Sequence, residues 1–101
     1  MGENIINSVK AGLPLRDICI IDCHCHLGFY KNFNIPANTA EDMLRSMDII
    51  GVNYKACIAP HAASVGPDYR YGNNIAVETV TKYPKRFFGY VAINPSYDML
   101  W

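Results

Sequence analysis

Two histidines one residue apart, His24 and His26, close the short apolar run of residues 18–25 and carry the clearest potential for chemistry. In an extended strand, residues i and i+2 point to the same face, so both imidazoles are expected to project side by side from the end of the strand. Neutral imidazole nitrogen is a preferred ligand of zinc, and a catalytic zinc needs about three protein ligands and an open position. The pair therefore predicts two ligands of a divalent metal, with zinc favoured.

The competing interpretation is that both histidines are ordinary polar residues at a strand end, hydrogen-bonded to the backbone. Their shared face at the end of an apolar strand favours the metal. Asp22 is expected on that same face, one pleat deeper, where an unpaired carboxylate would be costly. Two roles are open for it: orienting a ligand imidazole from behind, or accepting backbone N–H bonds.

Three of the four cysteines, Cys19, Cys23 and Cys25, lie on this one short strand. Neighbours along a strand cannot form sound disulfides with one another, so reduced thiols buried as small hydrophobes are expected. A structural zinc cluster over residues 23–26 is the alternative. Such clusters take a second ligand pair from elsewhere in the chain, and the sequence contains none.

The chain has 101 residues, half of them hydrophobic, which suffices for one domain with a real core. Lys plus Arg equal Asp plus Glu at nine each, so there is no basic field for a nucleic acid. Residues 1–17 are expected to form an N-terminal arm without a signal-type segment, and no stretch reaches membrane-spanning length. A cytoplasmic protein with no nucleic-acid or membrane partner is the default expectation.

The hydrophobic pattern predicts alternating strands and helices joined into a parallel sheet by right-handed crossovers. The first strand is apolar on both faces, as in a parallel strand covered by helices on both sides. The second helix is expected to be capped by Asn73 or Asn74 and to bury Ala76, Val80 and Tyr83. The expected elements are strand 18–25, helix 39–50, strand 52–59, helix 73–83 and strand 87–93.

Both strand-to-helix connections are about a dozen residues long, whereas the helix-to-strand returns are two or three. The long loops therefore gather at the carboxyl end of the strands, where α/β proteins build active sites. All three histidines, His24, His26 and His61, fall at that end. For His61 the options are a further metal ligand, a substrate contact or a solvated loop residue.

Tyr69, Arg70 and Tyr71 are expected in the loop after the second strand. An Arg fork between aromatic walls could clamp a carboxylate-bearing substrate, and surface packing of the loop is the alternative. The substrate-binding candidates are therefore His61, Tyr69 and Arg70.

Residues 21–28, Ile-Asp-Cys-His-Cys-His-Leu-Gly, resemble the opening His-x-His strand of the amidohydrolase superfamily. Residues 73–95, with the string Tyr-Pro-Lys-Arg-Phe-Phe-Gly, are similar to the second helix and third strand of its amidohydrolase-related branch. That branch includes aminocarboxymuconate-semialdehyde decarboxylase and related metal-dependent hydrolases and decarboxylases. The resemblance covers residues 18–95 and implies the first strands and helices of a (β/α)₈ TIM-type barrel, with a metal on His24 and His26.

The resemblance implies a hydrolase or decarboxylase that acts on a small carboxylate- or lactone-like substrate through a metal-activated water. The family's remaining histidine ligands and its late aspartate base have no counterpart before Trp101, and such a barrel needs about 250 residues. Residues 18–101 are thus expected to be the N-terminal portion of a barrel, with an incomplete catalytic set and no activity alone. Its open edges predict a homo-oligomer or a complementing remainder of the barrel.

Two alternatives differ in kind from this enzyme portion. One is a non-catalytic truncated module that folds by self-association or with a complementing partner. The other is a small flavodoxin-like doubly wound domain, which begins with the same order of elements. The latter needs a phosphate-binding loop after the first strand, and residues 27–31 are too bulky to form one.

Overall fold

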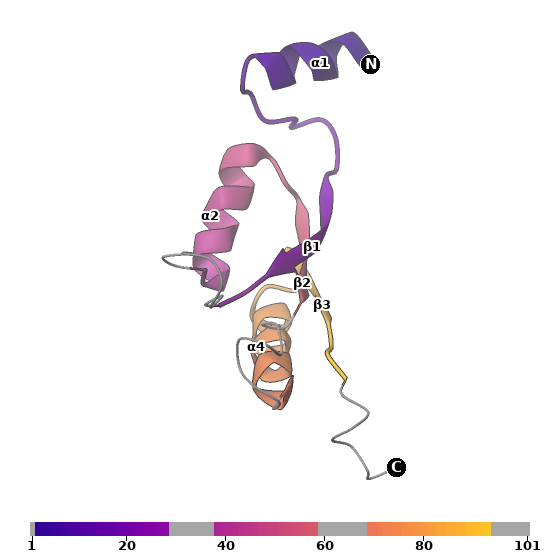
Figure 1. Ribbon diagram of the computed structural model, residues 1–101. Helices are drawn as coiled ribbons and strands as arrows, with labels where there is room; N and C mark the ends of the chain where they lie inside the picture. The colour runs from indigo at the N-terminus through magenta and orange to yellow at the C-terminus, as the bar shows by residue number, and fades with distance from the viewer. Residues whose placement is uncertain (1, 29–37, 59–68, 94–101) are drawn as a thin grey trace.

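The computed structural model describes residues 2–28, 38–58 and 69–93, and these ranges form a mixed α/β fold (Figure 1). The predicted alternation of strands and helices is confirmed, with an additional helix, α1, inside the N-terminal arm. The elements are α1 (Gly2–Lys10), β1 (Ile21–His26), α2 (Ala40–Ile50), β2 (Tyr54–Ile58), α4 (Tyr69–Lys82) and β3 (Phe87–Tyr90). Within these ranges, no helix has the length and apolar character needed to cross a membrane.

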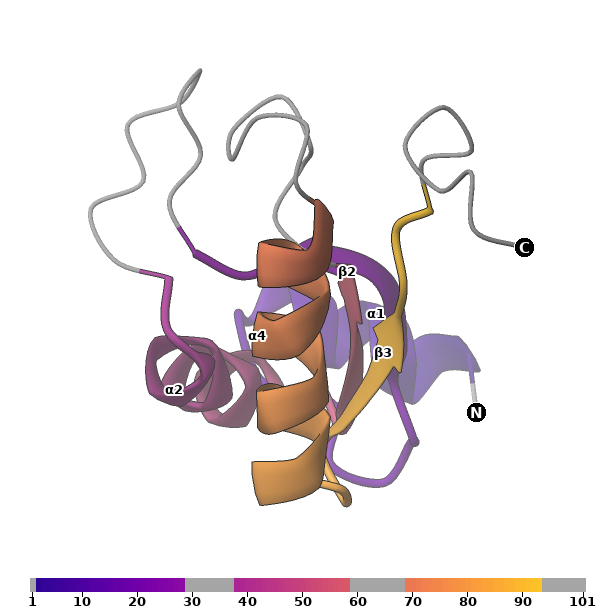
Figure 2. The same cartoon turned by 90° about the horizontal axis from the view of Figure 1, so that it is seen from below.

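The three strands form one parallel sheet in the order β1-β2-β3. Side chains of α2 and α4 pack into a single cluster with Cys25 of β1 and Phe87 of β3, so both helices cover the same face of the sheet (Figure 2). A flavodoxin-like domain places its first strand between the second and third. The sequential order found here therefore does not fit the flavodoxin-like alternative.

The core lies between this face of the sheet and the two helices. Met47 and Phe87 are its largest fully buried side chains. The predicted inner stripe of the second helix is confirmed, because Ala76 is buried and Val80 and Tyr83 pack against the core cluster. The members of the buried cluster are Cys25, Leu27, Met43, Met47 and Phe87.

The opposite face of the sheet, called the open face below, carries exposed side chains. On β1, Ile21, Cys23 and His24 are exposed and only Cys25 is buried. The expectation of a first strand covered on both faces is therefore wrong, since α2 and α4 both lie on one side. Burial of the cysteines likewise holds for Cys25, whereas Cys19 and Cys23 are exposed thiols.

Helix α2 begins and ends where its sequence predicts. Thr39 Oγ1 accepts the Asp42 amide at 3.1 Å and Asp42 Oδ2 accepts the Thr39 amide at 3.1 Å, which completes a capping box. At the other end Gly51 has φ 81° and donates its amide to Met47 O. This left-handed conformation is costly for any residue with a Cβ.

Gly51→Ala is expected to lower the free energy of unfolding by about 2 to 3 kcal/mol, because left-handed strain of about 1 to 2 kcal/mol adds to a steric clash. A Cβ at Gly51 would lie 2.9 Å from Pro14 Cβ and 3.2 Å from Leu15 N. Gly12→Ala is the matched control, since Gly12 has φ 67° but would meet no atom within 4 Å. Urea unfolding of both variants isolates the clash, and equal losses would exclude it.

Helix α4 begins at Tyr69, four residues before the predicted cap at Asn73, so that prediction is wrong. The Asn73 side chain is used differently. Its Nδ2 donates to Ala92 O at 2.9 Å, and Ala92 N donates to its Oδ1 at 2.8 Å. Asn73 therefore ties the second turn of α4 to the chain just beyond β3.

An ion pair joins the first turn of α2 to the last turn of α4. Glu41 Oε1 accepts hydrogen bonds from Lys82 Nζ at 2.7 Å and from Tyr83 OH at 2.6 Å. The Lys82 bond first, and then the Tyr83 bond, lower the pKa of Glu41 to about 2. The same contact raises the pKa of Lys82.

Because the Glu41 pKa is lower in the folded chain, its stabilisation is present above pH about 4.5, the ordinary value, and is lost as the pH falls towards about 2. Glu41→Gln is therefore expected to lower Tm at neutral pH and to leave Tm unchanged near pH 2. Thermal unfolding followed from pH 2 to 7 measures this effect. A Tm difference between the variant and the wild type that is equally large at pH 2 and at pH 7 would show that the carboxylate charge plays no part.

Candidate metal centre

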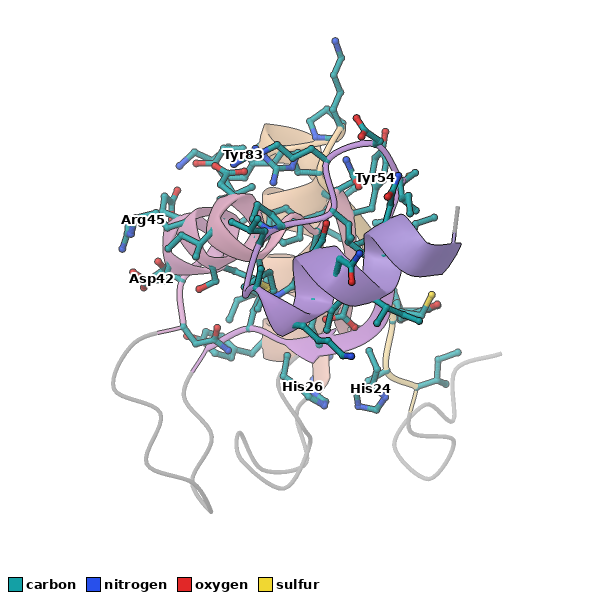
Figure 3. The ribbon with its side chains drawn as sticks, turned by 90° about the horizontal axis from the view of Figure 1, so that it is seen from above. His24, His26, Asp42, Arg45, Tyr54 and Tyr83 are labelled. Carbon is teal, nitrogen blue, oxygen red and sulfur yellow. The ribbon has the colours of Figure 1, made fainter. Side chains whose placement is uncertain are left out.

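The two histidines of β1 lie together at its carboxyl end, as predicted (Figure 3). His24 Nε2 and His26 Nε2 are 3.1 Å apart, and the ring centroids are 5.1 Å apart with the planes at 68°. A hydrogen bond between them needs a proton on one Nε2 and a free lone pair on the other. The pair thus presents two ring nitrogens to one point in space.

A β-bulge in β1 sets the direction of these side chains. Asp22 pairs with Lys55 and Cys25 with Cys57, so β1 advances three residues where β2 advances two. The one extra residue disturbs the ladder, and bulges of this kind re-aim side chains. His24 lies inside this irregular stretch, and His26 follows directly after it.

Asp22 stabilises the bulge through the backbone. Its Oδ1 accepts the amide N–H of His24 at 3.0 Å, which is the second of the two roles left open for it. Its register with Lys55, and through Lys55 with Phe87, places Asp22 on the face covered by the helices. The expectation that Asp22 shares the histidine face is therefore wrong, because the extra residue shifts the alternation.

His26 is held from the other side by the segment that leads into α2. The side-chain amide of Asn38 donates to His26 O, and Gly28 N donates to Asn38 O at 2.8 Å. The Nδ1 atom of the His26 ring is buried, and its Nε2 atom lies 3.1 Å from His24 Nε2. The backbone of His26 is thus held in place by hydrogen bonds with the segment before α2.

The separation of the two nitrogens fits a chelated metal ion. With nitrogen–zinc bonds of 2.0 to 2.1 Å, two ligands on one ion lie about 3.3 Å apart in tetrahedral and about 2.9 Å apart in octahedral geometry. The Nε2 atoms at 3.1 Å fall between these values. Among the described residues, no group of three His, Cys, Asp or Glu side chains converges, so they offer two candidate ligands at this point.

The buried thiol of Cys25 does not complete this site. Cys25 is buried on the helix-covered face, where its ladder partner is Cys57, whereas His26 is one residue further and faces the other way. A mixed Cys and His cluster over residues 23–26 would need side chains from both faces to meet. The strand geometry therefore separates the Cys25 thiol from the imidazole pair.

The structure describes only some of the predicted substrate-binding residues. His61 lies outside the described residues. Tyr69 and Arg70 form the first turn of α4, so their predicted place in a loop is wrong, and the Tyr69 side chain lies outside the described part. Arg70 is exposed.

Two residues of the open face were not among the site residues predicted from the sequence. Phe88 and Tyr90 alternate along β3, and their ring centroids are 6.1 Å apart. Tyr90 is in register with Ile58, and Ile58 with His26, so Tyr90 shares the row and the face of the second histidine. Their spacing, two aromatic residues at i and i+2 of the third strand, could have indicated that they share a face.

Comparison with family models, with curated proteins and with solved structures found no match to this chain. The likeness of residues 21–28 and 73–95 to amidohydrolase-related proteins therefore depends on those residues alone. The geometry of the histidine pair is independent of it.

Proposed function

We propose that this chain is the N-terminal part of a metal-dependent enzyme of the amidohydrolase-related type, with His24 and His26 as ligands of a divalent ion, preferably zinc. The proposed reaction is hydrolysis or decarboxylation of a small carboxylate- or lactone-like substrate. The observation that carries the proposal is the 3.1 Å separation of the two Nε2 atoms at the carboxyl end of a parallel strand. Two imidazoles there have the spacing that one ion requires.

The arrangement of the elements supports a barrel. Strands follow one another in the order β1-β2-β3, and α2 and α4 lie on a single face. Consecutive βα units of a (β/α)₈ barrel have this order, with helices outside and side chains of the opposite face inside. The histidine pair projects from that opposite face.

Each residue of the site has a separate task in this proposal. His24 and His26 bind the ion through neutral Nε2, Asp22 holds the bulge that aims His24, and Asn38 holds the carbonyl of His26. The ion, when bound, supplies Lewis acidity that polarises a carbonyl or carboxyl oxygen of the substrate. The described residues offer two ligands, so further ligands and the general base would come from other parts of a barrel.

A second candidate is a non-catalytic module that associates with itself or with a complementing partner. The exposed apolar residues of the open face favour it, because Ile21 is 51% and Phe88 36% exposed. The outer edges of β1 and β3 are also unpaired within the described sheet. Both candidates predict association, and only the enzyme portion predicts specific metal binding at His24 and His26.

Zinc titration of the whole chain by calorimetry, with a phosphine reductant to keep the thiols reduced, tests the proposal. We expect one zinc per chain, no change in Cys23→Ser, and loss of binding in the double variant His24→Ala/His26→Ala. Hydrolase turnover by the chain alone is not expected. Zinc binding that survives the double variant and disappears in Cys23→Ser would reject the imidazole site.

A further inference from the structure

Two aromatic side chains of β3, Phe88 and Tyr90, contact each other on the open face. Phe88 and Tyr90 are 36% and 45% exposed, and their rings meet edge to face, with centroids 6.1 Å apart and planes at 81°. This is the preferred geometry of an aromatic pair, and it restricts the orientation of both rings. Phe88 therefore orients the ring of Tyr90 rather than filling the core.

Tyr90 and the histidine pair share one surface of the sheet. The register runs from His26 through Ile58 to Tyr90, which are partners across neighbouring strands. Because strands lie about 4.8 Å apart, the backbone of Tyr90 is about 10 Å from that of His26. A small molecule anchored near the imidazoles and extending across the sheet would reach the tyrosine.

The end of β3 is fixed in place. Asn73 bonds both the N–H and the C=O of Ala92, two residues after Tyr90, from the second turn of α4. Phe87, three residues before Tyr90, is fully buried in the core. The strand that carries the aromatic pair is thus anchored on both sides, as a ligand-contacting element must be.

We infer that Tyr90 is a specificity-determining residue of the proposed metal site and that Phe88 is the positioning residue that orients its ring. The inference rests on the proposed function. A ligand held through oxygen atoms at the ion on His24 and His26 places its distal part against Tyr90, whose ring packs on flat apolar groups and whose hydroxyl pairs with a polar substituent. Selectivity for the distal part of the ligand is then set by β3, and anchoring by β1.

Two hydroxamates test this division, because benzohydroxamate and acetohydroxamate bind zinc through the same two oxygens and differ in the distal group. Binding of each to the zinc-loaded whole chain is measured by calorimetry. Tyr90→Leu is expected to weaken benzohydroxamate by about three- to tenfold, the range of one aromatic contact. Acetohydroxamate affinity and zinc affinity are expected to stay unchanged.

Tyr54→Leu is the matched control. Tyr54 is an exposed tyrosine in register with Ile21 at the other end of β1, so its loss is expected to change neither hydroxamate. NMR of the wild-type chain provides a readout that needs no variant: the Tyr90 ring resonances are expected to shift with benzohydroxamate, and those of Tyr54 are not.

The possible failures are distinct. Zinc binding with no shift of the Tyr90 ring, or with equal losses for both hydroxamates in Tyr90→Leu, overturns the role of Tyr90 and leaves the metal site standing. Absence of zinc binding overturns the proposed function itself.

Discussion

Phe87→Ala is expected to lower the free energy of unfolding by about 3 to 5 kcal/mol, the usual cost of deleting a buried phenylalanine ring. The Phe87 side chain is 1% exposed and lies in the cluster that joins β1, α2 and β3. Its ring also packs near Tyr83, with centroids 6.2 Å apart. Since domains of this size are stable by only about 5 to 15 kcal/mol, this loss is a large fraction of the total stability.

Urea unfolding followed by circular dichroism measures the loss, and the neighbouring Phe88→Ala is the control. Phe88 faces the open side, so its truncation is expected to cost less than about 1 kcal/mol. A loss for Phe88→Ala as large as that for Phe87→Ala would mean that the two faces of β3 are buried alike. The assignment of a single core on the helix side would then be wrong.

His24→Ala and His26→Ala are each expected to weaken zinc binding by about 100-fold or more. Changes to residues behind the ligands already cost about 10- to 100-fold in metal affinity, and loss of a ligand removes the chelate altogether. The two variants are expected to behave alike, because each removes one of the two imidazoles whose Nε2 atoms lie 3.1 Å apart. Calorimetric titration of each single variant checks this, with unfolding curves to confirm an intact fold.

Asp22 provides a finer control on the same site. Asp22→Asn keeps an oxygen that can accept the His24 amide, whereas Asp22→Ala removes the acceptor that holds the bulge. Zinc affinity is expected to be preserved in the first and reduced about tenfold in the second. Equal effects of the two substitutions would instead assign the role to the carboxylate charge.

Local signals in the sequence predicted much of this fold correctly. Thr39 with acidic residues after it, and Gly51 at the end of the apolar stripe, define α2, because capping and left-handed glycine act within a few residues. The parallel sheet follows from the alternation of strands and helices along the chain. These features depend on residues and elements that are close together in the sequence.

Other features depend on contacts between distant segments and could not be predicted in this way. The bulge at His24 arises from the pairing of β1 with β2, and it moves Asp22 to the other face. Asn73 resembles a helix cap in sequence, but its partner is Ala92 in another element. Cys23 is exposed because α2 and α4 both pack on the other face of the sheet.

Some parts of the candidate site were likewise predicted from the sequence, and others were not. The spacing of His24 and His26 predicted a shared face, and the structure brings their Nε2 atoms together. The contributions of Asn38 and Tyr90 come from the folded arrangement, since one follows a long connection and the other belongs to the third strand.

X-ray absorption spectroscopy at the zinc edge of the zinc-loaded whole chain identifies the atoms bound to the ion. We expect two imidazole nitrogens at about 2.0 to 2.1 Å, with oxygen in the remaining positions and no sulfur. The signal of the imidazole rings is expected to disappear in the double variant His24→Ala/His26→Ala. Sulfur at about 2.3 Å, the zinc–thiolate distance, or a zinc shell without imidazole in the wild-type chain would rule out His24 and His26 as the zinc ligands.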